Sequence, residues 1–499
     1  MAVDEGGALG LYISIPFCRS KCTYCNFASG VYPASEHERY VGRLIEDIQA
    51  ASGWAARMDI QLPRRVDTVY LGGGTPTLLA PELLERLFAA MRAEFDLDLE
   101  AEITVECAPG QLADEMLAAL IRAGVNRVSL GVQSFIDREA AVSGRLHNSA
   151  TVERDLLRLR AAGIANLSMD LIAGLAGQTF ASWEESLEAL IGCGAPHASV
   201  YMLEVDEDSR LGREVLAHGV RYHAGLVPTE DAIAQMYSTA IERLGSAGLA
   251  QYEISNFCRP GFASRHNLRY WHRRPYLGLG LDASSMLRVA RTAQAEEEPG
   301  FVTGHSFSRA EKKLPTEGGG GFNPCIKPIQ STRTLAPEER SFVTSPANAL
   351  CASSFRLLSG ERVGTQESQS DLIREATHSE GLVLRSTTTD DLAAYLAGAE
   401  SLETTLLTPE RQHEEAWFLG LRLNAGVDVA ALKREFGPAM VAPALKAVGR
   451  LVESGLLASD GKTVHLTAQG QLLSNDVFQE FIAPQTKPAT RMDRGRVIA

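Results

Sequence analysis

Apolar positions in the first half of the chain follow two alternating spacings. Short runs rich in Val, Ile, Leu and Tyr, such as LYISIPF (11–17) and VDTVYLGGGTP (66–76), have the length and composition of strands. Between them, segments such as ERYVGRLIEDIQA (38–50) and PELLERLFAAMRAEF (81–95) place apolar residues three or four positions apart, as amphipathic helices do. The alternation continues to a helical segment at 229–248 and gives six strand–helix units.

Six strand–helix units predict an α/β fold with a parallel sheet and right-handed crossovers. Several strands are apolar nearly throughout, which is typical of strands covered on both faces. The number of units is compatible with a doubly wound sheet or a barrel. Polar residues gather at the carboxyl ends of the strands, where barrels of the TIM type carry their chemistry, so we favour a partial (β/α)6 TIM-type barrel over residues 1–286.

The regular pattern stops near residue 287. From 287 to 385 the chain is rich in Gly, Pro, Ser, Thr and Glu and shows no sustained period. A loop of this length is unusual inside a compact domain, so we interpret it as a low-complexity insertion that is largely disordered.

Helical periodicity resumes in 386–483 and is followed by a hairpin pattern with Asp460 and Gly461 at its turn. Three helices and a hairpin predict a helical, winged-helix-type C-terminal domain, followed by a flexible tail at 484–499. Its third helix carries only Lys446 and Arg450 as basic residues, so a structural or lid role is favoured over DNA binding.

Composition narrows the choice of partners. The net charge of −14 over 499 residues argues against a general nucleic-acid binder, which needs a basic face. The sequence shows no run of 18 apolar residues and no export signal at its start, which predicts a cytoplasmic protein without a transmembrane segment. Its eight cysteines fit a reducing compartment better than a disulfide framework.

Three of the cysteines stand close together in FCRSKCTYCNF (17–27), with the spacing C-x3-C-x2-C. A zinc site would require a fourth ligand, which usually comes from a second pair such as CxxC. The chain contains no second CxxC pair. A redox pair of Cys22 and Cys25 would leave Cys18 without a role. Thiolates also hold 4Fe–4S clusters, and three of them leave one iron open for a small molecule.

A glycine run, YLGGGTPTLL (70–79), follows the next predicted strand. Glycines allow a ligand to approach the backbone closely. A phosphate-binding loop would continue with Lys and Ser or Thr, which are missing here, so nucleotide hydrolysis is disfavoured.

Polar side chains recur near the later strand ends. Glu106 and Asp170 can accept hydrogen bonds from an amine or from ribose hydroxyls, and Arg145 can hold a carboxylate. Gln133 ends another predicted strand, and Tyr12 lies on the first strand, six residues before Cys18. Taken singly, each can equally be an ordinary cap or surface residue.

The cysteine and glycine motifs together resemble the radical S-adenosylmethionine (SAM) family. The resemblance implies a 4Fe–4S cluster on Cys18, Cys22 and Cys25, with SAM on the open iron. One electron from the cluster then cleaves SAM to a 5′-deoxyadenosyl radical. The SAM-contacting positions that the family implies are Tyr12, Tyr24, Gly73, Gly74, Thr75, Glu106, Gln133, Arg145 and Asp170.

Within that family the sequence is most similar to the branch of oxygen-independent coproporphyrinogen III oxidase and the haem chaperones of the HemW type. Phe27 stands where the oxidase has a further cysteine, which favours the chaperone. An H-N-x-x-Y-W motif associated with haem is matched by His266, Asn267, Tyr270 and Trp271. We therefore expect haem, an acceptor protein and an electron donor as partners. Oxidative decarboxylation of a porphyrinogen is the alternative, and a zinc-stabilised scaffold a distant third.

Overall fold

The computed structural model describes residues 7–290, 381–398 and 402–482. Its main element is a large mixed sheet whose strand order is β13-β12-β11-β10-β1-β3-β4-β5-β6-β7-β9-β8, with β2 paired to β11. Six strands in the middle run parallel in chain order. They are β1 (Leu9–Ile15), β3 (Arg65–Gly73), β4 (Asp96–Cys107), β5 (Arg127–Gln133), β6 (Asn166–Ala173) and β7 (His197–Met202).

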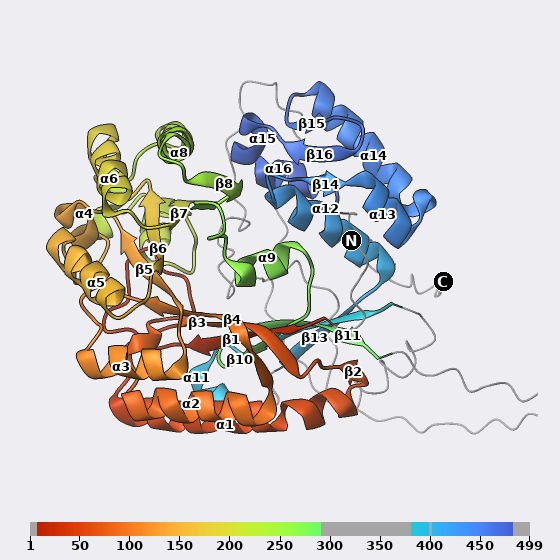
Figure 1. The fold of residues 1–499 in the computed structure, drawn as a ribbon. Coiled ribbons are helices and arrows are strands. Elements are labelled where there is room, and N and C mark those ends of the chain that lie inside the picture. The colour runs from red at the N-terminus through yellow and green to blue at the C-terminus, as the bar shows by residue number, and fades with distance from the viewer. Residues whose placement is uncertain (1–6, 291–380, 399–401, 483–499) are drawn as a thin grey trace, which may run out of the picture. The chain divides into compact units, whose positions relative to one another are not determined.

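Helices connect these strands and cover one face of the sheet (Figure 1). The connecting helices are α1 (Ala34–Arg57), α2 (Pro81–Glu94), α3 (Asp114–Ala123), α4 (Asp137–Val142), α5 (Ser149–Ala161) and α6 (Phe180–Cys193). After β7 come α7 (Arg210–Leu216), the 3-10 helix η2 (Arg221–Leu226) and α8 (Glu230–Ser246), and η1 (Pro76–Leu78) follows β3. The six predicted strand–helix units are confirmed, and the sheet they form is open among the described residues, as in a partial barrel.

Further strands extend both ends of the sheet. On one side β7 pairs antiparallel with β9 (Asn256–Cys258), which pairs with β8 (Ala250–Glu253). The other side adds β10 (Tyr276–Leu279), β11 (Ser284–Val289), β2 (Ile60–Gln61), β12 (Val383–Thr388) and β13 (Leu402–Leu407). The short helix α9 (Arg265–Trp271) lies between β9 and β10 in the chain, and α11 (Leu392–Leu396) between β12 and β13.

The two faces of the parallel strands differ in chemistry. Side chains that face the helices, such as Val69, Val105 and Leu167, are buried in one large apolar cluster. The alternate residues are also buried but include polar groups: Thr104, Ser129, Ser168 and Ser199 are all at most 4 % exposed. The inner face of the partial barrel is therefore polar, and the prediction that the strands are apolar nearly throughout holds for one face only.

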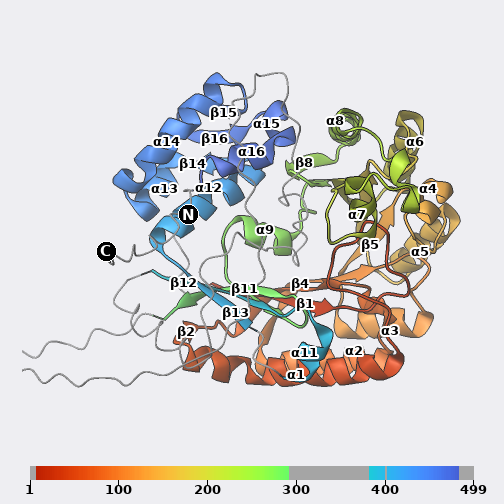
Figure 2. The same ribbon diagram turned by 180° about the vertical axis from the view of Figure 1, so that it is seen from behind.

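The C-terminal part forms the predicted helical, winged-helix-type fold. It contains α12 (Pro409–Arg422), α13 (Val429–Phe436), α14 (Pro438–Glu453), α15 (Ala468–Leu472) and α16 (Ser474–Gln479). A small sheet has the order β14 (Val427–Asp428), β16 (Thr463–Leu466) and β15 (Leu457–Ser459), and Gly461 takes a left-handed φ of 85° at the hairpin turn. The helices and the small sheet appear in blue in Figures 1 and 2.

Most of the predicted insertion, 287–385, and the predicted tail, 484–499, lie outside the described residues. The edges of the insertion differ from the prediction, since β11 continues to Val289 and β12 already begins at Val383. These two strands pair with each other, so 386 falls inside the large sheet. No helix in the described part of the chain is long and apolar enough to cross a membrane.

Candidate functional site

The three clustered cysteines lie in a loop that leaves the carboxyl end of β1 and lines a cavity of about 220 Å³. The loop is held by backbone bonds: Cys18 N–H donates to Gly30 O at 2.8 Å, and Thr23 N–H donates to Ser143 O at 3.0 Å. The Lys21 ammonium also donates to Phe27 O at 3.0 Å. These bonds place all three thiols on one wall of the cavity.

Two of the three thiols, Cys18 and Cys25, are protonated in the absence of a bound group. Burial raises the pKa of Cys18, and it raises the pKa of Cys25 to about 11. Cysteine binds iron as the thiolate, so loading a cluster here releases protons. No group of three His, Cys, Asp or Glu side chains in the described ranges is placed to hold one metal ion. A cubane cluster attaches each cysteine to a different iron, so its ligands need not converge on one point.

The glycine run forms the neighbouring wall, at the end of β3. Gly73 has a left-handed φ of 99°, which a residue with a side chain rarely adopts. A Cβ at Gly74 would lie 2.7 Å from Phe17 O and 2.8 Å from Ile15 O, closer than real Cβ contacts. Gly74 N–H donates to Ile15 O, and Thr75 N–H to Phe17 O. The run therefore anchors the base of the cysteine loop as well as lining the cavity.

Glu106, at the end of β4, is fixed by the same wall. Its carboxylate accepts from Tyr70 Oη–H at 2.8 Å and from Gly73 N–H at 3.2 Å. A Cβ at Gly72 would lie only 2.9 Å from Glu106 Oε1, so the glycine also leaves room for this carboxylate. Carboxylate oxygens can each accept more than one hydrogen bond, which leaves Glu106 able to bind a ligand amine.

Asp170 and Gln133 line the cavity from β6 and β5. The Ser129 hydroxyl lies 3.1 and 3.0 Å from the two oxygens of Asp170. Burial raises the pKa of Asp170, while hydrogen bonds from Ser199 and Ser129 act in the opposite direction. Gln133 has a φ of 67°, unusual for a residue with a side chain, at a bulge where β5 shifts register against β6. Strained backbone of this kind is common at ligand sites.

Arg145 and Tyr24 complete the set of predicted residues in the cavity. Arg145 Nη1 lies 3.6 Å from Cys22 Sγ, and its Nη2 donates to Gly131 O. Tyr12 is placed differently: it is buried behind the glycine run, with its ring centroid 6.2 Å from that of Tyr70. A Cβ at Gly73 would be 3.6 Å from the Tyr12 hydroxyl, so Tyr12 supports the wall from outside the lining.

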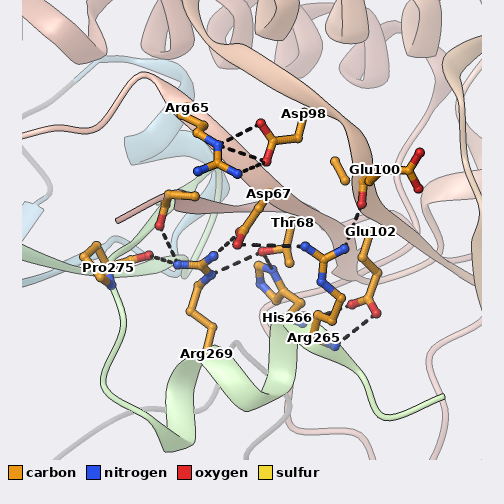
Figure 3. A network of polar contacts seen from close by, with 12 residues as sticks. Arg65, Asp67, Thr68, Asp98, Glu100, Glu102, Arg265, His266, Arg269 and Pro275 are labelled. Atoms are coloured by element: carbon orange, nitrogen blue, oxygen red, sulfur yellow. Dashed lines mark hydrogen bonds and ion pairs between the residues drawn. The ribbon is translucent and has the colours of Figure 1, made fainter. Parts of the chain in front are cut away.

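The residues of the H-N-x-x-Y-W motif lie on α9, and none of them lines this cavity. Figure 3 shows His266 and Arg269 of α9 directed at Thr68 and Asp67 of β3. His266 is fully buried; its Nδ1 is 3.0 Å from Thr68 Oγ1 and its Nε2 is 2.8 Å from Tyr270 Oη. Burial, helped by the charges of Arg269 and Arg127, holds the pKa of His266 well below its usual range.

The rest of the motif is also engaged in packing. The Glu102 carboxylate accepts from the N–H groups of Arg265 and His266, both at 3.0 Å, and so satisfies the start of α9. Tyr270 and Trp271 belong to the apolar cluster that contains Trp417, while Asn267 is half-buried. In this arrangement His266 has no free ring nitrogen for iron, and haem contact by the motif stays a prediction.

Sequence reasoning missed several residues of the cavity. Gln111, Tyr201, Glu204 and Asp206 also line it. Gln111 Oε1 is buried and has no hydrogen-bond partner among the described residues, which suits an acceptor waiting for a ligand. Glu204 follows the carboxyl end of β7 by two residues, so the strand-end rule applied to Glu106 and Asp170 would have found it.

Models of two families match this sequence. The radical SAM superfamily matches residues 12–190, which contain the cysteine loop and the proposed SAM positions. The HemN C-terminal domain matches residues 407–473, in the winged-helix-type part.

Whole-chain relatives give a more specific result. The chain is 30% identical over 475 residues to a "Heme chaperone HemW" of Bacillus subtilis, which covers 94% of this chain and 98% of the relative. It is 28% identical over 471 residues to that of Lactococcus lactis, covering 94% and 96%. A solved structure of HemN, the Escherichia coli coproporphyrinogen III oxidase, described as a radical SAM enzyme, shares the fold. Its TM-score is 0.66 at 18% identity, over 95% of this chain and 90% of that one. The chain therefore belongs to the HemW family, within the radical SAM superfamily.

Proposed function

We propose that this chain is a haem chaperone of the HemW type, which binds a 4Fe–4S cluster, SAM and haem and passes haem to an acceptor protein. The observation that carries the cofactor part is the cavity at the strand ends, where three thiols face a glycine wall and fixed polar groups. The haem part is supported by two relatives that span nearly the whole chain and are named heme chaperones. The chain would also receive electrons from a donor protein and would be located in the cytoplasm.

The residues of the cavity fit both cofactors. Cys18, Cys22 and Cys25 would each hold one iron of the cluster, and the fourth iron would be left for SAM. When bound and reduced, such a cluster supplies the electron that cleaves SAM in this superfamily. Glu106 would accept from the SAM amine, since Tyr70 and Gly73 already fix its carboxylate.

The other polar groups would hold the remaining parts of SAM. Arg145, kept beside the cysteine loop by Gly131 O, would neutralise the SAM carboxylate. Asp170, oriented by Ser129, would accept from the ribose hydroxyls. Gln133, whose backbone is strained at the bulge, would donate or accept at the same ligand.

The alternative, oxidation of coproporphyrinogen III, has weaker support. The solved structure of HemN, the coproporphyrinogen III oxidase, is 18% identical and shows the fold alone. Phe27, which replaces the further cysteine expected in the oxidase, lines the cavity. A phenyl ring supplies no thiol for that chemistry.

Anaerobic reconstitution of the whole chain tests the proposal. Iron and sulfide should be present at about four each per chain, as the cubane requires. SAM should bind saturably in equilibrium dialysis, and haem titration should produce a saturable shift of the Soret band. Conversion of coproporphyrinogen to protoporphyrinogen would support the alternative and contradict the proposal. Iron without haem binding would retain the radical SAM assignment and remove the chaperone.

A further inference from the structure

Segment 213–226, formed by α7 and η2, exposes an unusual amount of apolar surface. Leu216 is 58% exposed, Val220 85% and Leu226 53%, within eleven positions of one another. Exposed apolar side chains that form a contiguous patch mark a binding surface, whereas single ones are common.

The same segment carries two exposed histidines, His218 and His223. Neither imidazole has a hydrogen-bond partner in the described part of the chain. Their φ angles are 53° and 60°, and Tyr222 between them has 54°. Left-handed backbone at three non-glycine residues in six positions is costly, and such strain is concentrated at functional sites. His266, in contrast, is buried with both ring nitrogens engaged.

Arginines lie among these residues. Arg213 and Arg221 are both exposed. The nearest carboxylate contact of Arg221 is with Glu214 at 3.9 Å, a loose and solvated ion pair. Both guanidinium groups therefore remain available to carboxylates of a ligand.

The segment is fastened to the cysteine loop at its start. Leu211 N–H donates to Thr23 O at 2.8 Å, and the Arg210 guanidinium donates to Lys21 O. Asn26 of the loop donates to Asp206 at 2.6 Å, three residues before Ser209 caps α7. The start of α7 therefore lies against the cysteine loop on both sides of Cys22. α7 is labelled in Figure 2.

We propose that haem docks on segment 213–226, with the imidazole of His218 or His223 as ligand to its iron. The inference rests on the proposed function, in that it requires haem binding. Haem is a flat apolar ring with a metal that takes imidazole and with two carboxylates on its edge. Leu216, Val220 and Leu226 offer apolar contact, and Arg213 and Arg221 offer partners for the propionates.

Haem titration of the reconstituted whole chain tests this site. We expect the double variant His218→Ala/His223→Ala to bind haem at least tenfold more weakly than wild type and with a different Soret position. Val220→Asp, which leaves both imidazoles in place, should weaken binding about fivefold by charging the apolar surface. His272→Ala, an exposed histidine outside the segment, should bind as wild type. Equal SAM binding by all four proteins shows that the variants are folded.

The outcomes separate the site from the function. Wild-type affinity and spectrum in the double variant would overturn the haem site on this segment, and would do so most plainly if His266→Ala lost binding. Failure of wild type itself to bind haem would overturn the proposed function, whatever the variants do. Loss in the double variant, with binding retained in His266→Ala, would establish the segment as the site.

Discussion

The cysteine cavity and helix α9 were predicted by the same kind of evidence, yet they differ in what their residues can touch. In the cavity, eleven of the twelve predicted cluster and SAM residues line one space, although they come from six different strands or loops. On α9, the four predicted haem residues lie together, but His266 is fully buried and its nitrogens bond to Thr68 and Tyr270. A motif gives the positions of residues, whereas access to a ligand depends on the elements packed around them.

The two regions are in physical contact, and this contact suggests a structural role for the α9 motif that does not involve haem. The rings of His266 and Tyr70 have centroids 5.3 Å apart, and Tyr70 in turn donates to Glu106 in the cavity. A buried helix can thus support the floor of the proposed SAM site through one tyrosine. The comparison predicts that substitutions on α9 weaken packing and SAM binding, and that substitutions in the cavity abolish cofactor binding.

The largest effect is expected from Cys22→Ala. Removing one of only three thiolates leaves two irons without a protein ligand, so anaerobically reconstituted protein should lose nearly all of its cluster iron and brown absorbance. Cys193→Ala is the matched control, because Cys193 lies on α6, outside the cavity, and should keep full cluster content. A Cys22→Ala protein with wild-type iron and sulfide would remove the cluster assignment.

Glu102→Ala should produce the next largest effect, confined to α9. The substitution leaves two N–H groups at the start of the helix without an acceptor. Losing the partner of a buried N–H group lowers the stability of the helix by about 1–3 kcal/mol. Hydrogen–deuterium exchange of the 264–271 amides should therefore be faster by roughly ten- to a hundredfold. Glu100→Ala, two residues earlier and exposed, should leave exchange unchanged. Unchanged exchange in Glu102→Ala would mean that α9 does not depend on this cap.

The sequence was sufficient for the parts of the molecule that repeat or that carry unusual residues. Strand–helix alternation predicted the six central units, and the cysteine and glycine motifs predicted two walls of the cavity. The short strands that extend the parallel core were missed: β8, β9 and β10 are only three or four residues long, too short for a period to register. β12 was missed because its partner β11 precedes it by more than ninety residues.

Burial was the quantity least accessible from sequence. Nothing in H-N-x-x-Y-W indicates that Glu102 and Thr68, more than 160 residues away in the chain, surround its histidine. Likewise, Ser and Thr on the inner face are neutral in a hydrophobicity pattern, so the polar interior went unrecognised. Gln111 was missed because it follows β4 in a loop and carries no motif.

Lowering the pH should destabilise the folded chain through its buried histidines. Burial keeps the pKa of both His197 and His266 well below the usual value of about 6.5, so the unfolded chain binds protons that the folded chain does not. Stability from these groups is present above pH 6.5 and is lost as the pH falls below it, by roughly 1 kcal/mol per histidine between pH 6.5 and 5.5. His266→Gln should flatten this dependence of the unfolding midpoint, and His465→Gln in the wing should not. Parallel curves for both variants would contradict a buried neutral His266.

The smallest effect, and the most specific test of coupling, is expected from Tyr70→Phe. The variant keeps the ring against His266 but removes the hydroxyl that fixes Glu106. One hydrogen bond to a charged group contributes about 1–2 kcal/mol, and part of that orients the carboxylate, so the Kd for SAM should rise about fivefold while the cluster stays intact. Tyr395→Phe is the matched control, since it also removes a hydrogen bond to a carboxylate, that of Asp47, at a distance from the cavity. Because both variants lose the same type of bond, a general loss of stability would affect them alike. A SAM affinity lowered only in Tyr70→Phe would therefore show that the Tyr70 hydroxyl positions Glu106 for SAM, and equal affinities would remove that role of Tyr70.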